Sequence, residues 1–498
     1  MIVSRAGCPA LSSWLAATLI LSGCTPAAPG LGGAPSTAPA PSKSWVPPDD
    51  HPELVETPPG GDSVHALPED LLPRLQSLGL SDVVDLALRN NPATRQSWAS
   101  ARAAADLYGA SRGPYYPQID AQVTATRLKT TATQGRNAQQ QTVYGPVLNV
   151  SWLLLDFGGR SGTISQAREA LIAADWTHNA TIQNVVLTAQ SAFFQYQGTR
   201  ALLAAQQVSI KEAQANLDAA EQRNKVGLAT IADVLQAKTA LSQAQLDVLT
   251  TEGTLATARG ALAVSMGLPA NLPYEVDSLA GLQPVAPLAD SVDALIEQAV
   301  RDRPDLAAIQ AEVRQSEARI TEARGARLPS IVLNGSNGYT GVGGTTALKN
   351  SYAVTLGLQI PLFNGFGREY TQRAAESQAE ATRAGAQTLR QQVIAEVFSS
   401  YYALRTATRR VETTDDLLES AQRSADVALG RYREGVGSVI DLLTAEAALA
   451  DARAQQVQAR WIWQTALAQL ARDTGQLDER GGSSLRLGTD STGVEPSQ

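Results

Sequence analysis

The sequence predicts a mixed fold, in which long antiparallel coiled-coil helices are joined to four short β-strands, with two of the strands in each copy of an internal repeat. Three observations indicate it. Two long stretches, 147–268 and 362–495, contain no proline, and heptads of apolar residues run through both. Segments of about ten residues before these heptads alternate apolar and polar side chains. Sustained heptads are typical of coiled coils, and period-two alternation is typical of β-strands.

Composition excludes several classes of protein. The 498 residues carry 40 Lys and Arg against 48 Asp and Glu, a net charge of −8 that argues against nucleic acid as a partner. After residue 24 no apolar run reaches the length of a membrane-spanning helix. Cys8 and Cys24 are the only cysteines, and His51, His65 and His178 lie far apart. We therefore expect no disulfide framework, no metal site and no cofactor.

Residues 1–23 are interpreted as a lipoprotein signal peptide. An apolar stretch from Leu11 to Leu21 is too short to span a bilayer and ends in Leu21-Ser22-Gly23-Cys24, which resembles the bacterial lipobox. Cleavage before Cys24 would allow acyl chains on its thiol and its new amino group, and two or more chains can anchor a protein. The alternative is an ordinary signal peptide with a chance cysteine.

Residues 24–77 are interpreted as a lipidated N-terminus followed by a proline-rich tether. Residues 25–73 contain twelve of the 25 prolines, so we expect an extended segment with little secondary structure. His51 and His65 lie in it and are expected to be solvated.

The remaining chain is an internal repeat. Asn90-Asn91-Pro92 matches Asp302-Arg303-Pro304 at an offset of 212 residues, and the turn Arg223-x3-Gly227 matches Arg431-x3-Gly435 at an offset of 208. The repeats are assigned to 78–274 and 292–478, with a linker at 275–291 and a flexible tail at 479–498.

Four segments have the length and alternation of membrane β-strands: 118–128, 147–155, 330–340 and 351–360. A soluble sheet with one wet face is an equally open reading. The polar segment between Lys129 and Gln141 is expected to be an exposed hairpin tip. The helix from Arg160 to Val226 would be about 100 Å long at 1.5 Å per residue.

Four membrane strands cannot close a barrel, and an open edge is not tolerated in lipid. Two chains would supply eight strands and three would supply twelve. Eight strands fill their own interior, whereas twelve can leave a channel, so a homotrimer is favoured.

The residues also carry a resemblance to a known family. The motifs Ala87-Leu88-Arg89-Asn90-Asn91-Pro92, Leu328-Pro329-Ser330 and Pro361-Leu362-Phe363-Asn364-Gly365, with the paired Arg-x3-Gly turns, resemble the TolC-like outer-membrane efflux proteins. The likeness covers residues 78–478 and is strongest to the lipidated branch that serves resistance-nodulation-division pumps. It implies a trimeric twelve-stranded barrel continued by a periplasmic α-barrel, without enzymatic activity.

The resemblance implies an exit duct in the bacterial outer membrane, held by lipid and working with a periplasmic adaptor and an inner-membrane transporter. Two alternatives stay open: the outer-membrane component of a type I protein secretion system, and a periplasmic coiled-coil adaptor lipoprotein. An enzyme is not expected, because the sole histidine after the tether, His178, lies mid-helix without a convergent polar site.

Two groups of residues are the functional candidates. The turns containing Gly227, Leu228, Gly435 and Val436 are expected to meet the adaptor, since glycine can reverse a helix pair. By resemblance, Asp441 and Asp233 would form acidic rings at the pore gate, and Tyr432 would hydrogen-bond Asp233. Gly437 and Thr444 depart from the family pattern at the gate. The alternative is that both aspartates only cap helices.

Overall fold

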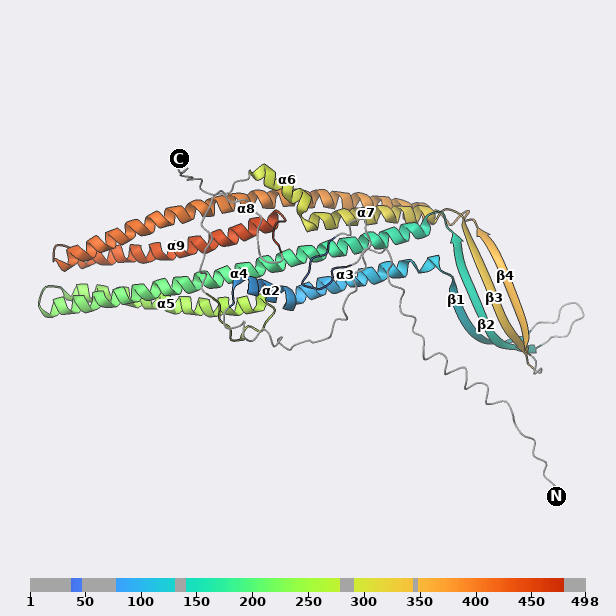
Figure 1. Cartoon of the computed structure of the whole chain (residues 1–498), viewed down its shortest axis with the longest axis horizontal. Coiled ribbons are helices and arrows are strands. Elements are labelled where there is room, and N and C mark those ends of the chain that lie inside the picture. The colour runs from blue at the N-terminus through green and yellow to red at the C-terminus, as the bar shows by residue number, and fades with distance from the viewer. Residues whose placement is uncertain (1–36, 47–77, 130–139, 278–290, 344–347, 479–498) are drawn as a thin grey trace, which may run out of the picture.

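The computed structural model describes residues 37–46, 78–129, 140–277, 291–343 and 348–478. These residues form a long bundle of helices with a four-stranded sheet at one end (Figure 1). The turns that join α4 to α5 and α8 to α9 lie at the opposite end of the molecule. None of the helices in the described ranges is long and apolar enough to cross a membrane.

Each half of the chain contributes the same series of elements. The first half comprises α2 (Leu80–Asn90), α3 (Pro92–Ser111), the 3-10 turn η1 (Gly113–Tyr115), β1 (Gln118–Lys129), β2 (Gln140–Leu155), α4 (Gly159–Lys225) and α5 (Ile231–Ser265). The second comprises α6 (Val292–Asp302), α7 (Pro304–Gly325), β3 (Ser330–Val342), β4 (Lys349–Gln359), α8 (Gly367–Arg433) and α9 (Val439–Asp473). The long helices α4 and α8 both have 67 residues, and α5 and α9 both have 35. The internal repeat is therefore confirmed, with an offset of 208 residues for these helices.

The sheet has the order β1-β2-β3-β4, and every neighbouring pair is antiparallel. All four strands lie where alternation predicted them. The first hairpin extends further than expected, because Leu128 pairs with Gln141 and Lys129 with Gln140. The ends of the predicted 129–141 tip thus belong to the ladder, and residues 130–139 lie outside the described ranges.

The apolar face of the sheet is not covered by helices. On β4, Tyr352, Val354, Leu356 and Leu358 alternate with small or polar residues and are 63–80% exposed. A soluble sheet with one wet face would bury such side chains against a core. Within a single chain these residues face outward, and the outer strands β1 and β4 each leave one edge unpaired.

The helical hairpins pack as the heptads predict. In the first hairpin, Leu217 and Ala220 of α4 are buried against Ala237 and Leu241 of α5. In the second, the corresponding cluster contains Ala421, Ala425, Ala445, Leu449 and Ala452. Alanine at alternate core positions lets the paired helices approach closely. The helix predicted from Arg160 to Val226 is confirmed as α4.

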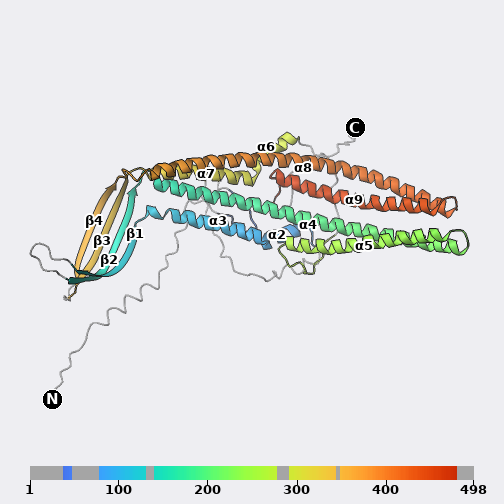
Figure 2. The same cartoon turned by 180° about the vertical axis from the view of Figure 1, so that it is seen from behind.

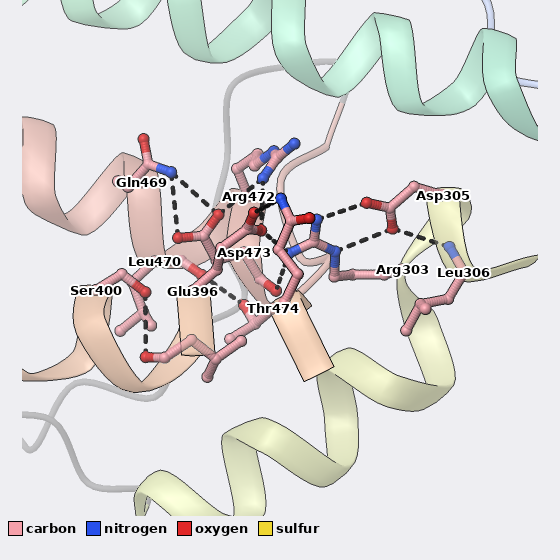
Figure 3. Close-up of polar contacts among 12 residues, drawn as sticks. Arg303, Asp305, Leu306, Glu396, Ser400, Gln469, Leu470, Arg472, Asp473 and Thr474 are labelled. Atoms are coloured by element: carbon pink, nitrogen blue, oxygen red, sulfur yellow. Dashed lines mark hydrogen bonds and ion pairs between the residues drawn. The ribbon is translucent and has the colours of Figure 1, made fainter. Parts of the chain in front are cut away.

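A buried arginine ties α6 and α7 to the second hairpin (Figure 3). Arg303, 3% exposed between α6 and α7, pairs with Asp305 at 2.5 Å and with Glu396 of α8 at 2.7 Å. Arg472 of α9 also contacts Glu396, at 3.3 Å. Burial opposes ionisation of Asp305, but hydrogen bonding and charge from Arg303 outweigh it and hold the pKa of Asp305 below its ordinary value.

Part of the proline-rich tether packs on the helices. Residues 37–46 contain no helix or strand, as expected, but Trp45 is buried and exchanges two hydrogen bonds with the Asn179 side chain of α4, at 2.6 and 2.7 Å. The Nε2 atom of His178 lies 3.0 Å from the Lys43 carbonyl oxygen. His178 is thus a structural residue that holds this segment, and His51 and His65 lie outside the described residues.

Candidate functional site

The two hairpin turns have the same backbone conformation. At the end of α4, the Leu228 amide donates to the Arg223 carbonyl and the Gly227 amide to the Asn224 carbonyl. At the end of α8, Val436 donates to Arg431 and Gly435 to Tyr432 in the same pattern. These paired bonds form a Schellman motif, which satisfies carbonyls at the end of a helix.

Glycine is required at one position of each turn. Gly227 has φ 75° and Gly435 has φ 76°, in the left-handed region where a side chain costs free energy. The next residues, Leu228 and Val436, are 71% and 68% exposed. An apolar residue at this position frequently packs on the preceding helix. Here both side chains are mostly exposed, which leaves each hairpin with an apolar tip.

The two candidate gate aspartates cap the helices that follow these turns. The Asp233 carboxylate accepts from the Thr230 amide at 2.7 Å, and the Thr230 hydroxyl accepts from the Asp233 amide at 3.3 Å. Asp441 and Ser438 form the same reciprocal capping box at the start of α9. The capping role is therefore present in the structure. Both carboxylates lie close to their tips, six residues after the glycine of each turn.

The structure does not contain the expected hydrogen bond between Tyr432 and Asp233. Tyr432 is 6% exposed, and its hydroxyl has no hydrogen-bond partner among the described residues. The Asp233 carboxylate instead accepts hydrogen bonds from the amide and the hydroxyl of Thr230, which are its described partners. The single chain therefore lacks the expected contact.

Sequence reasoning missed Arg223, which connects the two hairpins near the tips. Its Nη1 donates to the Tyr432 carbonyl oxygen at 2.6 Å, and its guanidinium lies 4.6 Å from the centre of the Tyr432 ring. The repeated Arg-x3-Gly motif marked the residue but gave no partner for it. The contact depends on how α4 and α8 approach each other, which the motif does not encode.

Further from the tips, α4 faces α9 across a polar seam. Arg453 forms a bidentate pair with Glu212, at 2.8 and 3.1 Å, and Asn216 donates to Glu446. Burial raises the pKa of Glu446. A cavity of about 250 Å³ lies along this seam, lined by residues of α4, α5 and α9. No group of three or more potential metal-ligating side chains occurs in the described ranges.

Cys24, the candidate lipidation site, lies outside the described residues. The remaining candidates fall into two places that the fold sets side by side. Gly227 and Leu228 lie at the tip of the first hairpin and Gly435 and Val436 at the tip of the second, with Asp233, Asp441 and Tyr432 within two turns of them.

Comparison with known families identifies this architecture. The model of the family described as "Outer membrane efflux protein" matches residues 83–268 and 295–476, one segment in each repeat. The chain belongs to the outer membrane efflux protein family. Members of this family are channels of the outer membrane and not enzymes, and the TolC-like channels are trimers that work with adaptors and inner-membrane transporters.

Curated relatives match along most of their length. Protein CyaE of Bordetella pertussis is 28% identical over 403 residues, which cover 77% of this chain and 81% of CyaE. The probable efflux pump outer membrane protein TtgC of Pseudomonas putida is 24% identical over 383 residues, covering 74% and 76% of the two chains. The family description and the name of TtgC favour an efflux channel over the two alternatives, a periplasmic adaptor and a type I secretion component.

Solved structures share the fold. A membrane protein from Pseudomonas aeruginosa superposes with a TM-score of 0.73 at 23% identity, covering 80% of this chain and 93% of the other. The CmeC outer membrane channel of Campylobacter jejuni gives a TM-score of 0.72 at 18% identity, with 87% and 94% covered. The mixed fold of long helices and a small antiparallel sheet is confirmed.

Proposed function

We propose that three copies of this chain form a passive exit duct in the outer membrane. The observation that carries the proposal is the isolated four-stranded sheet, with an uncovered apolar face and two unpaired edges at β1 and β4. Unpaired edges cannot persist in lipid, and closure with the sheets of two further copies gives twelve strands and satisfies every edge. The exposed face of β4 would then meet the hydrocarbon.

The helices would continue this barrel into the periplasm. At 1.5 Å per residue, the 67 residues of α4 and of α8 each extend about 100 Å. In a trimer, the six long helices and the shorter helices packed beside them would surround one axis and enclose a tunnel. Substrate delivered by an inner-membrane transporter through a periplasmic adaptor would pass along it, and the channel itself would supply no energy.

Cys24 would anchor the N-terminus of each copy in the membrane. The support is the lipobox-like Leu21-Ser22-Gly23-Cys24 at the end of the apolar stretch. Acylation at Cys24 and removal of residues 1–23 would add lipid chains to an already membrane-bound barrel. Intact-mass measurement of the mature protein tests this, and an unmodified Cys24 would contradict it.

The hairpin tips would dock the adaptor, and the aspartates beside them would form the gate. Leu228 and Val436 support docking, because both apolar side chains are exposed at neighbouring tips, where an adaptor would bury them and remove apolar surface from water. In the trimer, Asp233 and Asp441 would each contribute a ring of three carboxylates, and such rings make a pore selective for cations.

Two measurements test this function. Outer-membrane fractionation followed by gels of heated and unheated samples should show a heat-sensitive trimer in the outer membrane. Leu228→Trp and Val436→Trp should abolish export while the trimer yield stays unchanged. A periplasmic monomer, or full export from both tip variants, would contradict the assembly or the docking role respectively.

A further inference from the structure

Charged residues are rare in the described strands and unevenly placed. Asp120, Arg127 and Lys129 lie on β1 and Lys349 lies on β4, while β2 and β3 carry no charged residue within their described bounds. β1 starts beside the helices, and β4 starts at the end of the sheet that is remote from them (Figures 1 and 2). Arg127 and Lys129 end β1 and Lys349 begins β4, so the three basic residues are collected at the remote end.

Arg127 and Lys129 stand on the apolar face of the sheet. Side chains two residues apart along a strand share a face, so both stand on the face of Ile119 and Val123, which are 61% and 77% exposed. The pairing register places Ile119 on the same face as Val354 of β4. This is the face that the proposed barrel would turn toward lipid, and the two cations lie where it ends.

The other two charged residues stand on the opposite, polar face. Lys349 shares its face with Ser351 and Thr355 of β4, since all three alternate with the apolar side chains of that strand. Asp120 pairs with Asn149 on the same polar face. The sole acid of the described strands is therefore separated from the cations of the apolar face by the sheet itself, so it does not neutralise them.

Arg127 and Lys129 lie at the depth where a hydrocarbon layer would end. They follow Ile119 on β1 by eight and ten residues, which correspond to about 27 and 34 Å at about 3.4 Å per residue. With a strand tilt of about 40°, these lengths span about 21 and 26 Å across the membrane, and the apolar band of membrane barrels is about 25 Å tall. The flexible side chain of Arg127 can carry its charge the remaining distance to the headgroups.

Tyrosines mark the same level on the apolar face. Tyr144 pairs with Ala125, two residues before Arg127, and Tyr339 pairs with Asn350 near the start of β4. The two tyrosines are 40% and 49% exposed. Tyrosine favours the boundary between lipid chains and headgroups, because its ring is apolar and its hydroxyl is polar. The basic side chains beyond this boundary would therefore lie among the headgroups.

A side chain of the neighbouring strand orients the Arg127 guanidinium. With its amide oxygen turned toward Arg127, Gln140 of β2 accepts from Nε at 2.9 Å and from Nη2 at 3.1 Å. This contact leaves Nη1 to donate to another acceptor. Arginine presents its donors in a planar fork that matches phosphate oxygens, and Lys129, two residues further along β1, adds a compact charge.

We propose that Arg127 and Lys129 bind the phosphate groups of lipopolysaccharide. The proposal rests on the proposed barrel in the outer membrane. The helices would extend into the periplasm, so the opposite end of the sheet would lie in the outer leaflet, where the lipid carries phosphates on its sugar headgroup. Anionic phospholipids such as phosphatidylglycerol belong to the inner leaflet. At that level the apolar face carries no basic residue within the described strands.

Native mass spectrometry of the purified trimer tests the site, with lipid A, the phosphorylated anchor of lipopolysaccharide, as the probe. We expect the parent to retain lipid A with two phosphates in preference to dephosphorylated lipid A. A basic residue near an anionic headgroup changes affinity about fivefold, so Lys129→Gln should lower retention by about this factor. Arg127→Gln combined with Lys129→Gln should abolish the preference. Lys349→Gln is the matched control and should keep it, because it removes a cation from the same end of the sheet but from the polar face.

Three outcomes would overturn the site: equal losses in Lys129→Gln and Lys349→Gln, equal retention of dephosphorylated lipid A by the parent, and tighter retention of phosphatidylglycerol than of lipid A. A trimer that conducts but retains no lipid A would refute this site and leave the barrel standing. Absence of a trimer from the outer membrane would instead overturn the barrel on which the proposal rests.

Discussion

The guanidinium of Arg223 lies 4.6 Å from the centre of the Tyr432 ring and donates to the Tyr432 carbonyl oxygen over 2.6 Å. The two residues belong to the C-terminal turns of α4 and α8, so the contact joins the hairpins next to their tips. Cation–π contacts contribute about 0.5–2 kcal/mol, and a charged hydrogen bond adds to this. The pair therefore restricts movement of one tip against the other.

Arg223→Ala should raise the open probability of single channels in planar bilayers, because it removes this restriction. Arg223→Lys should fall between the parent and the alanine variant, since lysine keeps the charge but not the planar fork. Tyr432→Phe should change little, because the Tyr432 hydroxyl has no partner in the described part of the chain. Opening by Tyr432→Phe equal to that by Arg223→Ala would show that the hydroxyl, and not Arg223, holds the gate.

Asp441→Asn and Asp441→Ala should separate charge from capping. Both remove the negative charge and should lower the cation preference of the pore. Asparagine retains an oxygen that can accept from the Ser438 amide, whereas alanine loses this half of the capping box and should be the less stable of the two variants. Ion selectivity is measured from reversal potentials and stability from thermal unfolding. Unchanged selectivity in both variants would limit Asp441 to its capping role.

The sequence predicted most of the fold because its signals are periodic. Heptads predicted the helices α4, α5, α8 and α9, and alternation predicted the bounds of three strands within a few residues. The exception is β2, which begins at Gln140 rather than near residue 147. Proline at 146, within β2, interrupted the pattern there. The tips were found through the repeated Arg-x3-Gly motif. Contacts between distant elements, such as Arg223 with Tyr432 or Trp45 with Asn179, depend on packing that periodicity does not encode.

The buried Asp175 should make the protein less stable as the pH rises. Burial raises its pKa from 3.8 to about 8, and neither carboxylate oxygen has a hydrogen-bond partner among the described residues. The folded state therefore holds a proton that the unfolded state releases above about pH 4. The contribution of Asp175 to the free energy of unfolding therefore decreases as the pH rises from about 4 to about 8, and is constant above that.

Asp175→Asn should consequently raise the thermal midpoint more at pH 8 than at pH 5, because the amide needs no proton to remain neutral. Asp426→Asn, at an exposed position, should show no such dependence. An equal gain from Asp175→Asn at both pH values would place the Asp175 pKa near its ordinary value.

Arg303→Gln should destabilise the fold strongly. It would leave Asp305 without its cation and Glu396 with Arg472 as its remaining cation, beside a buried site. Breaking a fully buried pair costs about 3–5 kcal/mol. We expect a value toward the lower end, because the two carboxylates are 27% and 29% exposed. Arg301→Gln is the control, since its ion pair with Asp302 is exposed to solvent and contributes little to stability. Denaturant titration should rank the two variants in this order.

The most direct test of the proposed channel is conductance of the purified, detergent-extracted protein in planar lipid bilayers. We expect discrete current steps from fractions that contain the heat-sensitive trimer, a preference for cations, and none of this activity after dissociation to monomers by heat. Trimer fractions that insert into the bilayer without passing current, or monomers that conduct equally well, would contradict it.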